Sequence, residues 1–405
     1  MMNDAALGQA IEKHLLALCN EFGNRHVGSP GNKESTNYAK RVLASFGFET
    51  REKLFDCMEW EASQNVRLEA GGRNWPAQAG PYSLPFNGEG ELIAISTLDE
   101  LEHADITGRV VLLHGDIARE QVMPKNFVFY NPPHHQKLVS LLESERPAAL
   151  ICATGKNPGT AGSIYPFPLF EDGDFDIPSV TMKDMDGVRL LEHVGSTVRL
   201  SFESRRIPST GTNVIGSKGG VGTPNVIFCA HIDAKKDTPG ALDNGAGVAT
   251  LLGLAANLAH YRGEQRIEIA FLNGEDYYAV PGQMQYLADL GARIREIDLV
   301  VNLDALGHRD ADIAYSFYGC SDRVRNHAQA AFAQDPVFVE GDAWVQSDHT
   351  MFVMAGCPAI ALTSSDFGWL CQEITHTPKD ATNLVDCHKL ATTALALKRF
   401  VERIC

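Results

Sequence analysis

The sequence predicts an α/β protein with a mostly parallel central sheet, helices on both faces of that sheet, and an inserted β-rich domain. Two observations carry this prediction. From Asn213 onward, four apolar runs have the continuous character of strands buried on both faces, and helix-like stretches separate the first three; the runs are NVIFCA, IEIAFLN, DLVVNL and PAIALTS. Between residues 56 and 207, short strand-like runs alternate instead with loops rich in proline, glycine and asparagine.

The helices follow in order from the N-terminus. A first amphipathic helix is expected where apolar residues share one face, at Ile11, Leu15, Leu18, Cys19 and Phe22. After the loop NRHVGSPGN, a second helix ends at Gly47 and carries its apolar face at Tyr38, Val42, Leu43 and Phe46. The main domain comprises residues 1–55 and 208–405, and the insert comprises residues 56–207. A last amphipathic segment, from Leu390 to Ile404, is expected to close one face of the main sheet.

Composition and charge restrict the partners. The chain has 405 residues, of which 44% are hydrophobic and 21% charged, enough for a sizeable core in two or three domains. The net charge of −16 disfavours nucleic acid and anionic membranes as partners. No apolar run approaches the roughly 18 residues that span a bilayer. The nine scattered cysteines and the lack of a visible secretory signal predict a cytoplasmic protein with reduced thiols.

Acidic and imidazole side chains follow three of the predicted strands. His231 and Asp233 come directly after NVIFCA, Glu275 and Asp276 follow IEIAFLN, and Asp304 follows DLVVNL. In open α/β sheets, sites form outside the carboxyl ends of the strands, so we expect these side chains to lie together.

Two further residues complete the expected cluster. Asp243 lies twelve residues after His231, in a loop that returns to the sheet edge before a helix, and His376 lies in EITHTPKD. Imidazoles and carboxylates without cysteine suit Zn²⁺, Mn²⁺ or Co²⁺. The four carboxylates of Asp243, Glu275, Asp276 and Asp304 would repel one another unless cations neutralised them. Two divalent ions about 3.5–4 Å apart would do so.

This pattern resembles the two-zinc exopeptidase family that includes bacterial leucyl aminopeptidases, plasma glutamate carboxypeptidase-like enzymes and folate hydrolases. The resemblance extends to RHVGSPGN, ALDNGAG and SDHTMF, and the insert resembles a protease-associated domain. It implies that His231 and Asp304 hold a first zinc, that Asp276 and His376 hold a second, and that Asp243 bridges both. It also implies that Glu275 is the general base and that Asp233 orients the ligand histidine.

Two positions depart from that family's pattern. Asp276 stands where most relatives have glutamate, so the carboxylate is one methylene shorter. Thr375 stands where many relatives have a tyrosine that helps to hold the oxyanion. Either Tyr277, Tyr278 or His308 replaces that donor, or the transition state depends more strongly on the metal ions.

The resemblance implies hydrolysis of terminal amino acids from peptides, with zinc as the cofactor and Co²⁺ or Mn²⁺ as substitutes. An aminopeptidase is expected, because carboxylates such as Glu275 and Asp304 can hold a cationic α-amine. A carboxypeptidase or a dipeptidase is the alternative on the same scaffold. A carboxypeptidase would need arginines aimed at the substrate carboxylate, for which the candidates are Arg309, Arg323 and Arg325. A glutaminyl cyclase and a non-catalytic binding protein are less favoured functions of the same scaffold. The expected partner is a peptide substrate, and a homo-oligomer is left open.

Other histidines and aromatic residues receive less specific predictions. His134 and His135, next to two prolines, are expected in a surface loop. His349 in the SDH triplet has either a substrate-side or a structural role. Three aromatic residues near these motifs either line a pocket for a hydrophobic side chain or pack as a lid; they are Trp344, Phe367 and Trp369.

Overall fold

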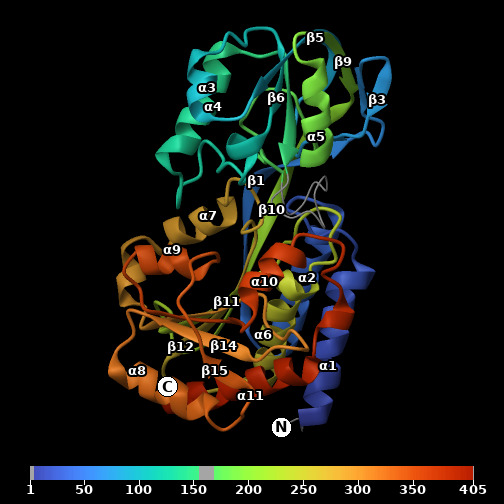
Figure 1. The fold of residues 1–405 in the computed structure, drawn as a ribbon. Coiled ribbons are helices and arrows are strands. Elements are labelled where there is room, and N and C mark those ends of the chain that lie inside the picture. The colour runs from blue at the N-terminus through green and yellow to red at the C-terminus, as the bar shows by residue number, and fades with distance from the viewer. Residues whose placement is uncertain (1–3, 155–167, 405) are drawn as a thin grey trace. The chain divides into compact units, whose positions relative to one another are not determined.

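The computed structural model describes residues 4–154 and 168–404, which form two compact units (Figure 1). The first unit comprises Met1–Cys57 and Thr210–Cys405, and the second comprises Met58–Ser209. The first unit is therefore built from the two ends of the chain, and the second unit is built from the sequence between them.

Both unit boundaries lie inside long strands. The strands are β1 (Glu49–Ala62) and β10 (Ser204–Gly219). The sequence analysis placed the boundaries two residues earlier at each junction, at 55/56 and 207/208. In β10 the run SRRIPSTGTNVIGSKG contains proline, glycine and serine, yet it continues as one strand.

The first unit contains an eight-stranded sheet in the order β1-β10-β12-β11-β13-β16-β14-β15. The strands besides β1 and β10 are β11 (Val226–His231), β12 (Arg266–Leu272), β13 (Leu299–Leu303), β14 (Ile313–Tyr318), β15 (Phe338–Glu340) and β16 (Ala359–Ser364). The four predicted apolar runs form β11, β12, β13 and β16, which are mutually parallel. The predicted α/β fold class is confirmed, but β10 and β14 pair antiparallel to this central group.

The order of the central strands reverses at β11. From β11 the chain crosses through α6 (Gly247–Asn257) to β12 on one side, and then through α7 (Pro281–Leu290) to β13 on the other side. Parallel crossovers are right-handed, so the reversal places α6 and α7 on opposite faces of the sheet. In sheets of this kind, ligands bind outside the carboxyl ends of the strands at such a reversal, which here are the ends of β11 and β13.

Each helix of the first unit buries apolar side chains. The helices are α1 (Asp4–Leu16), α2 (Pro30–Ser45), α6, α7, α8 (Asp322–Phe332), α9 (His349–Met354), α10 (Phe367–Glu373) and α11 (Cys387–Ile404). Helices α1, α6 and α11 pack against one another (Figure 1). The second helix begins as the sequence dictates, because Ser29 caps it through a bond from the Asn32 amide and Pro30 occupies its first turn.

The second unit has its own eight-stranded sheet, in the order β3-β2-β9-β5-β6-β7-β8-β4. Its strands are β2 (Arg67–Ala70), β3 (Arg73–Trp75), β4 (Gln78–Ala79), β5 (Phe86–Ile95), β6 (Val110–Leu113), β7 (Ala149–Thr154), β8 (Ser179–Lys183) and β9 (Thr197–Phe202). Its helices are α3 (Leu98–His103), α4 (Pro133–Glu145) and α5 (Asp184–Leu190). Alternate residues of β6 enter separate cores on the two faces, because Val110 and Leu112 join one and Val111 and Leu113 join the other.

Within the described part of the chain, no helix combines the length and the apolar composition needed to cross a bilayer.

Candidate active site

The predicted site residues gather at the carboxyl edge of the central strands. His231 is the last residue of β11, Asp304 directly follows β13, and Asp276 lies four residues after the end of β12. Asp243 lies in the helical turn that precedes α6, and His376 follows α10 with a left-handed φ of 60°. The structure brings all five predicted ligands together in the first unit.

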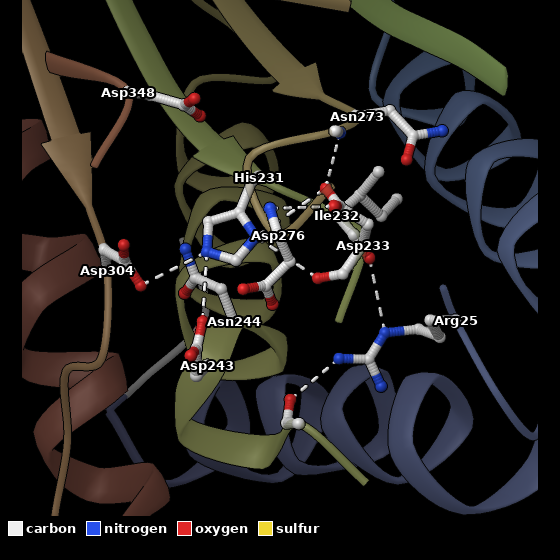
Figure 2. Close-up of polar contacts among 12 residues, drawn as sticks. Arg25, His231, Ile232, Asp233, Asp243, Asn244, Asn273, Asp276, Asp304 and Asp348 are labelled. Carbon is white, nitrogen blue, oxygen red and sulfur yellow. Dashed lines mark hydrogen bonds and ion pairs between the residues drawn. The ribbon is translucent and has the colours of Figure 1, made fainter. Parts of the chain in front are cut away.

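The carboxylate of Asp243 lies between the two histidines. Its Oδ1 is 3.1 Å from Nε2 of His231, and its Oδ2 is 3.1 Å from Nε2 of His376. Each histidine also faces one further carboxylate: Asp304 Oδ1 is 3.4 Å from His231 Nε2, and Asp276 Oδ1 is 2.9 Å from His376 Nε2. The site therefore consists of two half-sites that share Asp243. Figure 2 shows the half-site around His231.

The donor atoms fit two zinc ions. Zinc holds imidazole nitrogen and carboxylate oxygen at about 2.0–2.2 Å, so two ligand atoms of one tetrahedral ion lie about 3.3–3.6 Å apart. The four separations around Asp243 are close to that spacing. The Oδ2 atom of Asp276 is buried and has no hydrogen-bond partner among the described residues, as a vacant ligand atom would. His231, Asp243 and Asp276 also form a group of ligand atoms compact enough for a single metal ion.

The carboxylates strongly favour positive charge at this site. Burial disfavours the charged form of both imidazoles, but Asp304, Asp233 and Asp243 raise the pKa of His231 well above its usual range. Asp276 and Asp243 raise the pKa of His376 in the same way. Although burial opposes it, the two imidazoles lower the pKa of Asp243. Protons on the rings thus supply the charge when metal is absent, and a metal ion must displace them.

Asp233 connects the first two ligand-bearing loops. Its carboxylate oxygens accept hydrogen bonds from the backbone amides of Gly274 (2.7 Å) and Asp276 (3.1 Å). Its Oδ1 is 3.7 Å from Nδ1 of His231, whereas its own carbonyl oxygen is nearer, at 3.2 Å. The backbone carbonyl of Asp233 is therefore the nearer partner of the ring, and its carboxylate holds the loop that carries Glu275 (Figure 2).

Glu275 lies between the two amides that Asp233 anchors. Burial raises the pKa of Glu275 well above its usual range, and the carboxylates of Asp276, Asp304 and Asp348 add to this effect against the opposing charge of His231. A carboxylate with a raised pKa accepts a proton at a higher pH than an exposed glutamate does. The position and the environment of Glu275 suit a general base.

Two buried residues that hold the backbone around the site, Arg25 and Asp380, were not predicted from the sequence. Arg25 donates to four backbone carbonyls, which belong to Leu18, Ile232, Pro239 and Gly240. Asp380 accepts the backbone amides of Leu242 and Asp243. Both residues lie in the motifs RHVGSPGN and HTPKD, but their partners are backbone groups far away in the sequence. Only the motifs themselves could have drawn attention to them.

The contacts of His349 are those of a buried structural residue. Its ring is fully buried, with Nε2 2.8 Å from the carbonyl oxygen of Trp344 and Nδ1 3.3 Å from the Asn302 side chain. The neighbouring Asp348 accepts a bond from Gln283, and burial raises its pKa to about 7. Of the two roles that the sequence allowed for His349, the contacts favour the structural one.

The candidates to replace the missing tyrosine differ in their surroundings. His308 is engaged elsewhere, because its Nδ1 lies 2.8 Å from Asp366 and its ring stacks on Trp369. Tyr277 and Tyr278 directly follow Asp276 and are both buried, with ring centroids 4.5 Å apart. The two tyrosines therefore stay as candidates, and His308 is the weakest of the three.

A second histidine group lies in the other unit, and the sequence prediction for it was wrong. His134 and His135 do not lie in a loop but in the first turn of α4, because Pro132 precedes the helix as its N-cap and Pro133 is its first residue. His135 is buried. Both rings contact Glu120, at 3.2 and 3.3 Å. The Met123 amide donates to Nδ1 of His135, so the neutral ring carries its proton on Nε2 and cannot offer that atom to a metal.

Two of the three candidate arginines have neighbours other than the predicted ligands. Arg325 lies over the ring of Phe317 and 3.6 Å from Glu340. Arg309 lines a cavity of about 580 Å³ that it shares with Glu12 and Asp386 and with no predicted ligand. The structure thus gives no support to a carboxylate-binding role for either residue.

Comparison with known proteins agrees with this geometry. Residues 213–401 match peptidase family M28. A probable lipoprotein aminopeptidase, LpqL, of Mycobacterium tuberculosis is 25% identical over 368 residues, which are 87% of this chain and 68% of the relative. The aminopeptidase YwaD of Bacillus subtilis is 26% identical over 239 residues, 55% of this chain and 50% of the relative.

Solved structures share the fold over nearly the whole chain. An aminopeptidase from Aneurinibacillus sp. strain AM-1 superposes with a TM-score of 0.77 at 20% identity, covering 97% of this chain and 93% of the other. A glutaminyl cyclase from Porphyromonas gingivalis superposes less well, with a TM-score of 0.53 at 14% identity over 99% and 98% of the two chains. The matched segment 213–401 includes every predicted ligand and the base. The segment that carries the site therefore matches peptidase family M28.

Proposed function

We propose that the protein is a zinc aminopeptidase with two metal ions per chain. The observation that carries this proposal is the position of Asp243, whose two oxygens each lie 3.1 Å from a different histidine. Asp304 would complete the first ion's ligands and Asp276 the second's, and Co²⁺ or Mn²⁺ could replace zinc. The relatives named above as aminopeptidases support the choice of reaction.

Each residue of the site has a separate role in the proposed peptide hydrolysis. Zinc, when bound, supplies Lewis acidity and a water whose pKa is lowered toward about 7. Glu275 would accept a proton from the attacking water and pass it to the departing amine. Asp233 keeps Glu275 in place through the amides on either side of it. The backbone carbonyl of Asp233 holds the proton of His231 on Nδ1, which leaves Nε2 free to bind metal.

The anionic character of the site supports trimming from the amino end. An α-amine is cationic, and Glu275 and Asp304 offer it carboxylates, whereas Arg309 and Arg325 point elsewhere. The decisive experiment compares cleavage of a peptide with cleavage of its N-acetylated form by mass spectrometry. We expect residues to be lost only from the amino end and only when the amine is free. Equal rates on both forms, with loss from the carboxyl end, would make the protein a carboxypeptidase.

The same peptide assay also tests for cyclase activity. A peptide that begins with glutamine would lose ammonia and keep its length if the protein were a glutaminyl cyclase. We expect this peptide to be shortened instead, because both half-sites have their full sets of side chains.

A cytoplasmic location is also a proposal. It is supported by the eight cysteines of the described residues, none of which forms a disulfide. Fractionation of the source cells, followed by an activity assay of each fraction, tests it. Activity confined to membrane or secreted fractions would contradict it.

A further inference from the structure

We propose that Asp380 is a positioning residue that fixes the bridging carboxylate against the second histidine, and that the second metal ion depends on it more than the first. This inference rests on the two-metal function proposed above. Asp243 can bind two ions at once only if its backbone is held in one orientation. A small rotation there would turn one oxygen away from its histidine.

The contacts of Asp380 act directly on that backbone. Its Oδ1 accepts the amide of Leu242 at 2.7 Å, its Oδ2 accepts the amide of Asp243 at 3.1 Å, and its carbonyl accepts the amide of Ala241 at 3.1 Å. Three consecutive amides are thus held by one residue. The side chain of Asp380 is fully buried, and among the described residues no lysine, arginine or histidine forms a salt bridge with it. A buried carboxylate without a direct cationic partner is costly, so these amide bonds are its main compensation.

Asp380 is also rigidly connected to His376. The two residues belong to one tight turn, in which the Thr377 hydroxyl donates to the carbonyl of Ile374 at 2.6 Å and accepts the amide of Lys379 at 3.1 Å. The amide of Asp380 donates to the carbonyl of Thr377. Within five residues, this turn carries both the imidazole that faces Asp243 Oδ2 and the carboxylate that holds the Asp243 backbone.

The first half-site is anchored differently. His231 ends β11 and Asp304 follows β13, and these two strands are hydrogen-bonded neighbours in the central sheet. Their relative position does not depend on the turn of residues 374–380. Releasing Asp380 should therefore separate Asp243 from His376 while leaving His231 and Asp304 where they are.

The test is titration of metal-free protein with zinc alone, in competition with a chromophoric chelator. In Asp380→Asn we expect the first zinc affinity to stay near that of the wild type and the second to fall about 10- to 100-fold, the range typical for residues that hold metal ligands in place. The matched control is Asp172→Asn in the second unit, because Asp172 is also buried and accepts two backbone amides, from Lys125 and Asp174. This control should lose stability without any change in either zinc affinity.

The outcomes separate the two proposals. Wild-type protein that binds fewer than two zinc ions overturns the proposed function itself. Wild-type protein that binds two, with Asp380→Asn weakened at neither ion or equally at both, overturns the role of Asp380. If Asp380→Asn does not fold, amide hydrogen exchange of the wild-type protein is the test. We expect slow exchange at the amides of Leu242 and Asp243 with and without zinc. Rapid exchange of these amides in the metal-free protein would contradict the proposed role of Asp380.

Discussion

At the scale of single residues, Asp243 determines the chemistry of the site. Its carboxylate has one oxygen for each histidine, and a shorter or uncharged side chain could not serve both. The surrounding carboxylates make a metal-free site hold protons instead of metal. The same residues would therefore account for both the proposed affinity for zinc and its expected dependence on pH.

Glu275→Gln should separate proton transfer from metal binding. The amide cannot accept a proton, so kcat should fall about 100- to 10,000-fold, the usual contribution of a positioned acid or base. Zinc content should stay at the wild-type value, because Glu275 lies outside both half-sites. Steady-state kinetics and elemental analysis measure the two quantities. The control Glu402→Gln, at an exposed position of α11, should change neither. A variant with more than about a tenth of the wild-type kcat would assign the base elsewhere.

Zinc should stabilise the protein more as the pH rises. In the metal-free protein, His231 and His376 have higher pKa values in the folded state than in the unfolded state. Their protonation therefore stabilises the fold fully at a pH below the unfolded-state pKa, and this stabilisation is lost as the pH rises through the folded-state pKa. Zinc replaces those protons, so its binding strengthens over the same interval. The gap in Tm between zinc-loaded and metal-free protein should widen between about pH 6 and about pH 9. A gap that is constant or narrows would show that other residues bind the metal.

At the scale of elements, the start of α6 controls how closely the helix approaches β13. A Cβ atom on Gly247 would lie 2.3 Å from Oδ1 of Asn244 and 2.6 Å from the carbonyl oxygen of Leu303. Asn244 in turn donates to that same carbonyl, directly before Asp304. Glycine is therefore needed here because of close packing and not because of its backbone angles, since φ is −60°.

Gly247→Ala should consequently destabilise the protein by about 1–3 kcal/mol, the usual cost of overpacking, and weaken the first zinc. Denaturant unfolding of the metal-free protein measures the first effect, and zinc titration measures the second. Gly368→Ala is the matched control, because a Cβ atom there would meet nothing within 4 Å. If the two variants behaved alike, the packing argument would be wrong.

The sequence predicted those elements whose burial is uniform along the strand. β11, β12, β13 and β16 are mostly apolar and were predicted as strands, whereas β10 contains proline, serine and glycine and was not predicted as one continuous strand. The same contrast applies to the site. Residues that follow predicted strands could be placed at one edge, although their role as ligands stays a prediction. Arg25 and Asp380 could not be placed, because their partners are backbone carbonyls and amides that only the folded chain brings near.

At the scale of the whole molecule, the chain consists of two units with separate cores, and only one of them carries the site. Zinc should therefore stabilise only the first unit. In differential scanning calorimetry, saturating zinc should raise the transition of the first unit and leave that of the second unchanged, because a ligand stabilises what binds it. The two transitions can be assigned with the Asp172→Asn variant, which should lower only the second. An equal shift of both transitions would mean that the units unfold together.

The central claim is that two metal ions share Asp243. Anomalous diffraction at the zinc absorption edge, from crystals of the zinc-loaded protein, tests it most directly. The account predicts two peaks about 3.5–4 Å apart, one beside His231 and Asp304 and the other beside His376 and Asp276, with Asp243 between them. A single peak, or a second peak away from His376, would contradict it.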